Sequence, residues 1–265
     1  MAYKTLKVRG EGALVWLTLN RPEVLNAMNP TLVGELREFF GDLPSQQAVR
    51  VVVLRGAGRA FCAGLDLREA AAEPGGGVPA GLRAQRHISE LALLMRRAPQ
   101  PIIACVQGAA CGGGFALALA SDVRIAGESA RMNAAFIRIG LSACDVGVSY
   151  FLPRLVGASV AAELLLTGRF IHAERARNLG LVSAVVPDGE LEAEARKLAE
   201  EMLSTSPLGL RLTKECLNHS VDAGGLEAAI AMEDRNQILC AQGEDFREGV
   251  AAFLEKRPPV YGRAR

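Results

Sequence analysis

The amino-acid sequence predicts a mixed α/β protein whose C-terminal part is helical. Short apolar runs with strand character alternate with helical segments in the first half, and amphipathic helical patterns dominate from Val146 onward. With 265 residues, half of them apolar, the chain is long enough to bury a substantial core. We expect a core over residues 1–200 and a helical region over residues 201–265.

Local signals predict the N-terminal elements. Leu6–Val8 and Ala13–Leu19 are expected to pair antiparallel across a glycine turn. Asn29 suits a helix N-cap, and Pro30 suits the first helical position. Val51–Leu54 is expected to form a short buried strand.

Proline and a glycine triplet over residues 70–81 predict a loop. Later strands are expected at Ile102–Val106, Asp122–Ala126 and Leu181–Val186, and helices at Leu82–Arg97, Phe115–Ala120, Leu191–Leu203, Leu226–Cys240 and Phe246–Glu255.

The composition argues against several kinds of partner. Thirty basic and 29 acidic residues leave a formal charge of +1, which favours neither nucleic acid nor an anionic membrane as a partner. We expect a cytoplasmic protein, because the N-terminus lacks a signal-peptide core and no apolar run approaches the roughly 20 residues of a membrane span. Six cysteines without a C-x-x-C pair are expected to be reduced, and three histidines without ligand spacing indicate no metal site.

Two glycine-containing turns indicate where chemistry takes place. The apolar strand Ile102–Val106 leads into Gly112, Gly113 and Gly114, which open a helix whose first amides favour negative charge. A second turn, FCAGLD at residues 61–66, offers the amide of Ala63. Two such amides would suit the oxygen of a thioester enolate, although such turns also arise from close packing alone.

Four segments together resemble the enoyl-CoA hydratase/isomerase family, the crotonase superfamily. They are LNRPEVLNAMN (residues 19–29), AGRAFCAGLDL (57–67), PQPIIACVQGAACGGGFALALASDVRIA (99–126) and LTGRFIHAERARNLGLVSAVV (166–186). AAFLEKRPP (251–259) also resembles the family's closing helix. The resemblance implies a crotonase-like spiral of ββα turns, a helical C-terminal trimerisation region, a homotrimer or dimer of trimers, and acyl-CoA thioester substrates without a separate cofactor.

The resemblance also implies roles for individual residues. The amides of Ala63 and Gly113 would form an oxyanion hole, and Ala116, Phe136 and Leu141 would line the acyl pocket. CoA would lie along Val24, Leu25, Ala27, Ala63, Asp66 and Leu67, with Lys256 of a neighbouring subunit near its phosphates. Asp66 could instead pin the turn through local bonds, and Lys256 could be a solvated helix charge.

The sequence departs from the family at its usual proton carriers. Hydratases of the superfamily place carboxylates at the positions of Ala116 and Phe136, and neither of these side chains can move a proton. Water addition needs a base for the water and an acid for the α-carbon. The standard two-glutamate hydration mechanism is therefore not expected here.

Asp145 is the first replacement candidate, in the small-residue segment GLSACDVGVSY. After a one-residue offset it falls where dienoyl-CoA isomerases and aryl-CoA dehalogenases of the family carry a functional aspartate. It could cap a helix from Val146 onward, or carry a proton with a pKa raised by an apolar pocket. His87 and Glu90 are further candidates on a predicted helix, where a structural histidine and a surface charge are the alternatives.

Several functions are compatible with these residues. The first is enolate-based double-bond isomerisation of an acyl-CoA with Asp145 carrying the proton. Alternatives are hydration of an enoyl-CoA by non-standard residues, hydrolytic or aryl-CoA chemistry at Asp145, and acyl-CoA binding without catalysis.

Overall fold

The computed structural model describes residues 3–72 and 77–262. A six-stranded sheet has the order β1-β2-β3-β4-β6-β9, with β1 antiparallel to β2 and all other neighbours parallel. Its strands are β1 Leu6–Glu11, β2 Leu14–Leu19, β3 Val51–Gly56, β4 Ile102–Val106, β6 Val123–Gly127 and β9 Ala184–Val186. A second sheet of three strands, β5 Ala109–Cys111, β7 Arg131–Asn133 and β8 Ile171–His172, follows the carboxyl ends of the first.

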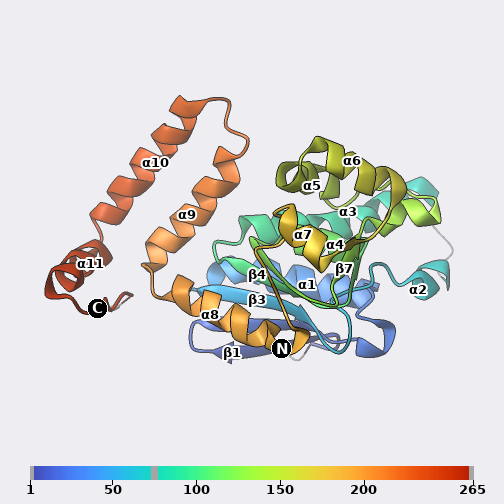
Figure 1. The fold of residues 1–265 in the computed structure, drawn as a ribbon, viewed down its shortest axis with the longest axis horizontal. Coiled ribbons are helices and arrows are strands. Elements are labelled where there is room, and N and C mark those ends of the chain that lie inside the picture. The colour runs from blue at the N-terminus through green and yellow to red at the C-terminus, as the bar shows by residue number, and fades with distance from the viewer. Residues whose placement is uncertain (1–2, 73–76, 263–265) are drawn as a thin grey trace.

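The described helices lie on both faces of the six-stranded sheet and beyond it (Figure 1). They are α1 Pro30–Asp42, α2 Leu67–Ala72, α3 Gly77–Arg97, α4 Gly113–Ala120, α5 Val148–Val156, α6 Ala158–Thr167, α7 Ala173–Asn178, α8 Leu191–Leu203, α9 Pro207–Ser220, α10 Leu226–Ala241 and α11 Glu244–Glu255. The predicted α/β core and helical C-terminal part are confirmed.

The N-terminal hairpin and helix cap are confirmed, although β1 extends through Gly10 to Glu11 and the turn is correspondingly shorter than predicted. Leu6 pairs with Leu19 in the antiparallel ladder of β1 and β2. The Asn29 side chain accepts a bond from the Leu32 amide at 2.9 Å, and Pro30 occupies the first turn of α1.

The loop predicted over residues 70–81 is wrong at both ends, because α2 runs to Ala72 and α3 starts at Gly77; residues 73–76 lie outside the described part. Alanine-rich sequence on one side and an amphipathic pattern on the other extend the helices toward the glycines.

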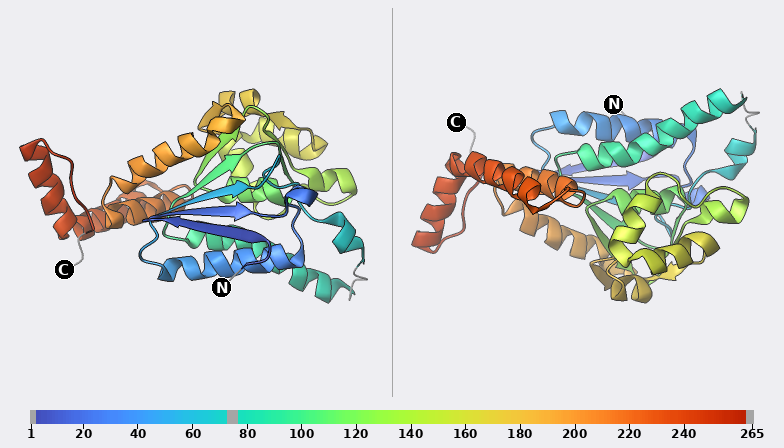
Figure 2. Two further views of the ribbon diagram at one scale, coloured as in Figure 1. Left: turned by 90° about the horizontal axis from the view of Figure 1, so that it is seen from below. Right: turned by 90° about the horizontal axis from the view of Figure 1, so that it is seen from above.

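Apolar side chains fill both faces of the sheet. On one face α1, α3 and α4 bury a large core that includes Leu17, Leu36 and Phe115. On the other face α8 buries a smaller core with Trp16 and Ile103. Figure 2 shows α8 and the α1–α3 layer on opposite sides of the strands.

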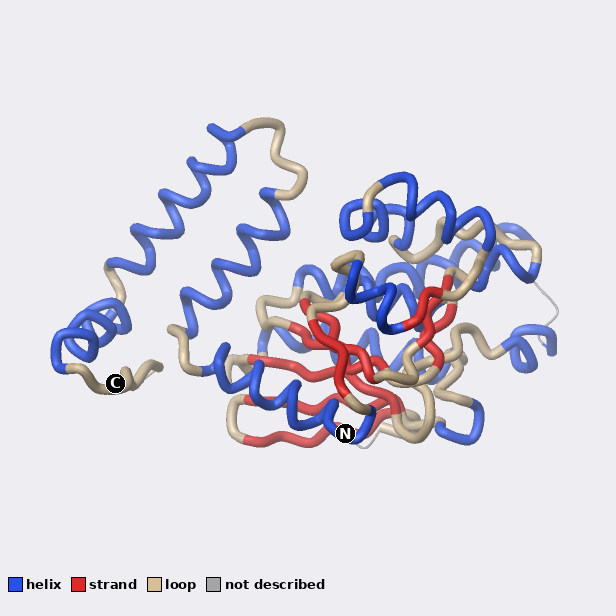
Figure 3. The backbone as a smooth tube through the Cα atoms, viewed as in Figure 1, coloured by secondary structure: helices blue, strands red, loops and turns tan. Residues whose placement is uncertain are grey.

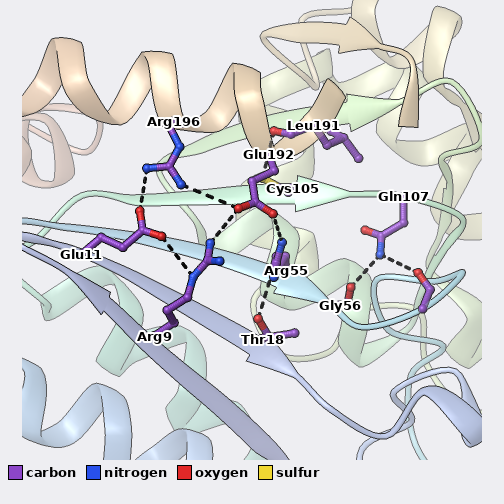
Figure 4. A network of polar contacts seen from close by, with 11 residues as sticks. Arg9, Glu11, Thr18, Arg55, Gly56, Cys105, Gln107, Leu191, Glu192 and Arg196 are labelled. Carbon is purple, nitrogen blue, oxygen red and sulfur yellow. Dashed lines mark hydrogen bonds and ion pairs between the residues drawn. The ribbon is translucent and has the colours of Figure 1, made fainter. Parts of the chain in front are cut away.

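An ion-pair network fastens α8 to the sheet (Figure 4). Glu192 of α8 pairs with Arg9 at 2.7 Å and with Arg55 at 2.5 Å, and Arg196 pairs with Glu11 at 2.6 Å. The guanidinium groups of Arg9, Arg55 and Arg196 also lie within 5.5 Å of the buried Trp16 ring centre. In such a network one side chain serves several ion pairs, so each pair costs less side-chain entropy than an isolated surface pair does.

The helices α9–α11 project from the core as an arm made of helices and short connections (Figure 3). At its base Lys214 is buried, with its Nζ 2.7 Å from Asp122 Oδ2, 2.8 Å from the Gln100 carbonyl and 3.2 Å from the Met95 carbonyl. Asp122 also accepts from the Ile102 amide at 2.8 Å. The arm is therefore attached through the buried Lys214 and its ion pair with the partly buried Asp122, next to β4.

Replacing Lys214 with Ala is expected to lower the free energy of unfolding by about 1–3 kcal/mol, because it removes the buried ammonium group that donates to the Gln100 and Met95 carbonyls, while Asp122 keeps its ion pair with Arg96 at 3.2 Å. Urea unfolding monitored by circular dichroism measures this change. Lys197→Ala, at an exposed position on α8, is the control and should change stability by about 0.5 kcal/mol or less. Equal stability of the Lys214 variant and the wild type would contradict this role.

Candidate active site

The first glycine turn takes the chain from the large sheet into the small one. Between β4 and β5, Gly108 has φ +55°, and a Cβ there would lie 2.0 Å from the Arg59 carbonyl oxygen. Gly112 has φ +49° and directly precedes α4. Only glycine fits such close backbone contacts and left-handed angles without strain. The sequence folds here so that α4 begins with Gly113 at the junction of the two sheets.

The second turn, residues 61–66, is held in place by Asn26. This side chain is fully buried, with φ +57°, an angle that asparagine tolerates better than most residues. Its Nδ2 donates to the carbonyls of Ala57 and Ala60 at 2.9 Å, and its Oδ1 accepts from the Arg21 amide at 2.9 Å. The 21–28 loop and the second turn therefore form one hydrogen-bonded unit.

The structure corrects the amide predicted from the second turn. The Ala63 N–H donates to the Leu25 carbonyl at 3.0 Å, so it is already bonded within the protein. Met28 and Leu65 form an isolated bridge in which Met28 donates to Gly64 and Asp66 donates to Met28, which turns the Leu65 N–H to the opposite side. Across the described residues, neither the Leu65 amide nor the Gly113 amide has a hydrogen-bond acceptor. These two amides replace the predicted pair of Ala63 and Gly113.

The two turns lie against each other without intervening side chains. A Cβ on Gly64 would come 2.8 Å from the Cys111 carbonyl oxygen, and one on Gly113 would come 2.8 Å from Met28 Sδ. A Cβ on Gly112 would meet the Phe136 ring at 3.4 Å. The free amides of Leu65 and Gly113 therefore belong to turns in direct contact, beside a thioether and an aromatic ring.

The acyl-pocket candidates surround the start of α4 and the segment after it. Ala116 lies on α4 and is fully buried, and Phe136 is buried against Gly112. Leu141 donates its amide to the Phe136 carbonyl at 3.1 Å, and the residue is 52% exposed. The structure thus places an apolar wall beside the turns, with Leu141 at its solvent edge.

Asp145 is a half-buried carboxylate just before α5, a helix that packs on α4. Its Oδ1 accepts from the Val146 amide at 2.8 Å and from Gln85 Nε2 at 2.5 Å. Burial raises the pKa of Asp145 above its ordinary value, although these two hydrogen bonds oppose the rise. The predicted N-cap role is wrong for α5, whose N-cap is Gly147 without a side-chain cap.

The two other predicted proton carriers lie outside this arrangement. His87 is exposed on α3. Glu90 forms an ion pair with Arg37 of α1 at 2.5 Å, which is the surface-charge alternative. Asp145 is therefore the candidate that is half-buried and forms no ion pair among the described residues.

The predicted CoA-binding residues divide into two groups. Val24, Leu25 and Ala27 lie on the loop bonded to the second turn, and Leu67 starts α2 beside it. Asp66 pairs with Arg21 at 3.0 Å; burial raises its pKa, but bonds from the Glu69 amide and Arg21 outweigh this and keep the pKa below its ordinary value. Asp66 thus pins the turn, as the structural alternative predicted.

Lys256 ends α11 with φ +56°, at the far end of the arm from α2 and α4 (Figures 1 and 2). Within one chain it is not brought to the site.

A separate cavity of about 920 Å³ lies between the carboxyl ends of β3 and β4 and the start of α8. Among the predicted site residues only Leu25 lines it, together with Gly108 of the first glycine turn, whereas Gly113 and Asp145 do not line it. In the described part of the chain, no group of three or more His, Cys, Asp or Glu side chains is arranged to hold a metal ion. None of the described helices is long and apolar enough to cross a membrane.

Three residues of the arrangement were missed by the sequence analysis: Leu65, Gln85 and Asn26. The Leu65 amide is free because Leu65 pairs with Met28 in an isolated bridge. Gln85 bonds Asp145 although the two residues are 60 positions apart in the sequence. Of the three, only Asn26 could have been noticed from the sequence, because it is an asparagine within the motif LNRPEVLNAMN.

Two unpaired turn amides, an apolar wall and a half-buried carboxylate define a site of the kind that binds a carbonyl oxygen and moves a proton beside it. The family model for enoyl-CoA hydratase/isomerase matches residues 9–264, and the chain belongs to this family. It is an enzyme of the enoyl-CoA hydratase/isomerase type.

Individual relatives and solved structures agree with this placement. A protein of Mycobacterium tuberculosis named "Probable enoyl-CoA hydratase" is 42% identical over 255 residues, covering 92% of this chain and 88% of that protein. The 1,2-epoxyphenylacetyl-CoA isomerase of Escherichia coli is 37% identical over 252 residues, covering 95% of both. The crystal structure of an enoyl-CoA hydratase from Bacillus anthracis superposes with a TM-score of 0.92 at 35% identity, covering 97% of this chain and 99% of that one. The predicted crotonase-like fold is confirmed.

Proposed function

We propose that the protein isomerises a double bond in an acyl-CoA thioester through an enolate, with Asp145 carrying the proton. The observation that carries this proposal is the juxtaposition of two unpaired amides, Leu65 and Gly113, with the turn and helices that hold one half-buried carboxylate. CoA enters as part of the substrate, and no separate cofactor is required by the chemistry.

The proposed reaction consists of two proton transfers, and Asp145 carries out both. The Asp145 carboxylate removes a proton from the carbon next to the thioester carbonyl of a 3-enoyl-CoA. The electron pair moves into the C–C bond and onto the oxygen, which accepts hydrogen bonds from the Leu65 and Gly113 amides. The Asp145 carboxylic acid then returns the proton to the γ-carbon, and the double bond moves into conjugation with the carbonyl.

The chemical environment of Asp145 suits this exchange. Burial raises its pKa toward the range in which a carboxyl group can both accept and return a proton. Ala116 and Phe136 offer no second proton carrier at the positions where, by the resemblance, hydratases carry glutamates. One carboxylate suffices for isomerisation, whereas hydration needs an acid and a base.

A substrate panel tests the proposed reaction. Wild-type protein is expected to convert trans-3-hexenoyl-CoA to the 2-enoyl isomer, measured by the absorbance of the conjugated thioester, and to hydrate crotonyl-CoA very slowly. Rapid crotonyl-CoA hydration without isomerisation would overturn the proposal and favour a hydratase that uses other residues.

We further propose that the active form is a homotrimer or a dimer of trimers in which Lys256 reaches the CoA of a neighbouring subunit. The exposed apolar side chains of the arm support this, among them Leu226, Ile238, Phe253 and Leu254, each more than 60% exposed in one chain. Light scattering at micromolar concentration is expected to give a mass of three or six chains.

Lys256→Ala is expected to weaken binding of acetoacetyl-CoA more than binding of the pantetheine thioester, because the lost charge would contact phosphate. Calorimetric titration of both ligands makes the comparison, with Lys197→Ala as a charge-matched control. A monomer, or equal weakening of both ligands, would contradict this placement.

A further inference from the structure

The two oxygens of Asp145 have different surroundings. Oδ1 accepts both the Val146 amide and Gln85 Nε2, whereas Oδ2 has no hydrogen-bond partner among the residues the structure describes. Val146 has φ +47°, an angle that a β-branched residue rarely adopts. The Val146 amide and Gln85 thus both bond Oδ1, and Oδ2 is left without a partner in the described part of the chain.

The second donor comes from another wall of the site. Gln85 lies on α3 and Asp145 lies just before α5, and both helices pack on α4, which begins with Gly113. The Gln85–Asp145 hydrogen bond, on the exposed side of these helices, therefore connects α3 with the segment that precedes α5. Val146, next to Asp145, is buried in the same core as Ala116 and Phe136.

We propose that Gln85 is a positioning residue, whose side-chain amide holds Asp145 Oδ1 so that Oδ2 is the oxygen that exchanges the proton with substrate. This inference rests on the proposed function and names how its carboxylate is oriented. A hydrogen bond of 2.5 Å to an ionised carboxylate is of the charge-assisted kind, which fixes orientation better than a neutral bond.

The neutral amide suits this role. Lysine or arginine at residue 85 would form an ion pair and hold the carboxylate ionised, which would oppose return of the proton. Glutamine donates without adding charge and cannot itself exchange a proton in the working pH range. It therefore orients Asp145 while leaving the carboxyl group able to change its protonation state.

Kinetics of Gln85→Leu with trans-3-hexenoyl-CoA test the inference. We expect kcat to fall by about 10- to 100-fold, the usual range for losing a hydrogen bond to a charged group, with KM little changed. The acidic limb of kcat/KM should move to higher pH, because the lost bond favoured the ionised form. Ser89→Ala, which removes a hydroxyl bonded within the same helix, should match the wild type in both respects.

A second measurement does not depend on turnover. Carbon-13 NMR titration of the Asp145 carboxyl group should give a higher pKa in Gln85→Leu than in the wild type. Gln85→Ala should show the same rise in pKa and replaces Gln85→Leu if leucine perturbs folding. Unchanged kcat, pH profile and carboxyl titration, with activity lost in Asp145→Asn, would overturn the role of Gln85 alone. Full isomerase activity in Asp145→Asn would overturn the proposed function and this inference together.

Discussion

Replacing the Leu65 amide by an ester is expected to lower isomerase turnover by about 10²- to 10³-fold, the effect of removing one donor from an oxyanion hole. Incorporation of the hydroxy-acid analogue of leucine changes the N–H to an oxygen and keeps the side chain. The Leu65 N–H has no acceptor within the described residues, so its loss removes no bond of the folded protein there. Single-turnover kinetics with trans-3-hexenoyl-CoA measure the change.

The same substitution at Ala63 is the matched control. It removes the 3.0 Å bond to the Leu25 carbonyl and is expected to cost about 1 kcal/mol of stability with little effect on turnover. If the Ala63 ester loses turnover and the Leu65 ester does not, the oxyanion donor is the Ala63 amide, as first predicted from the sequence, and not the Leu65 amide.

Asp145→Asn is expected to lower turnover by about 10²-fold or more while acyl-CoA affinity stays similar. Asparagine has nearly the same size and can still accept from the Val146 amide through its side-chain oxygen, so the local turn is retained. It cannot accept and return a proton, and this function accounts for the expected loss. Calorimetric titration with a saturated acyl-CoA separates affinity from turnover.

The pH dependence adds a second signature. The wild-type kcat/KM should rise as Asp145 ionises, with a midpoint above the ordinary aspartate range because burial raises its pKa. This limb should be absent in Asp145→Asn. Asp188→Asn, in an exposed pair with Ser129 at the separate cavity, is the control and should keep both the turnover and the limb. Equal loss in both variants would indicate a general effect of removing an acidic side chain.

Much of the fold was predictable because its signals are local. The Asn29 cap, the strand Ile102–Val106 and the helix Leu191–Leu203 each follow from neighbouring residues, and the structure places them as predicted. The strand expected at Leu181–Val186 is shorter, spanning Ala184–Val186, since it pairs with β6 only over those residues. The 70–81 loop failed because proline and glycine mark helix ends as well as loops.

The sequence indicated which turns would form the candidate site, but not which backbone amides would be free or which side chain would bond Asp145. The glycine triplet indicates an approachable backbone wherever it packs, and the Gly113 amide, which has no acceptor among the described residues, stays a proposed oxyanion donor. Which amide of the second turn is free depends on the bridge between Met28 and Leu65, a contact between segments that spacing does not reveal. Likewise, the partner of Asp145 was set by how α3 and α5 pack on α4, so Gln85 was missed and His87 and Glu90 were named instead.

We propose that one carboxylate and two backbone amides form and stabilise a thioester enolate, and a substrate that cannot isomerise tests this directly. Hexanoyl-CoA cannot isomerise, but its α-protons can exchange with solvent through that enolate. In deuterium oxide, mass spectrometry should show deuterium entering the α-carbon with the wild type and entering at least about 10²-fold more slowly with Asp145→Asn. No incorporation with the wild type, or equal incorporation in both proteins, would contradict the account.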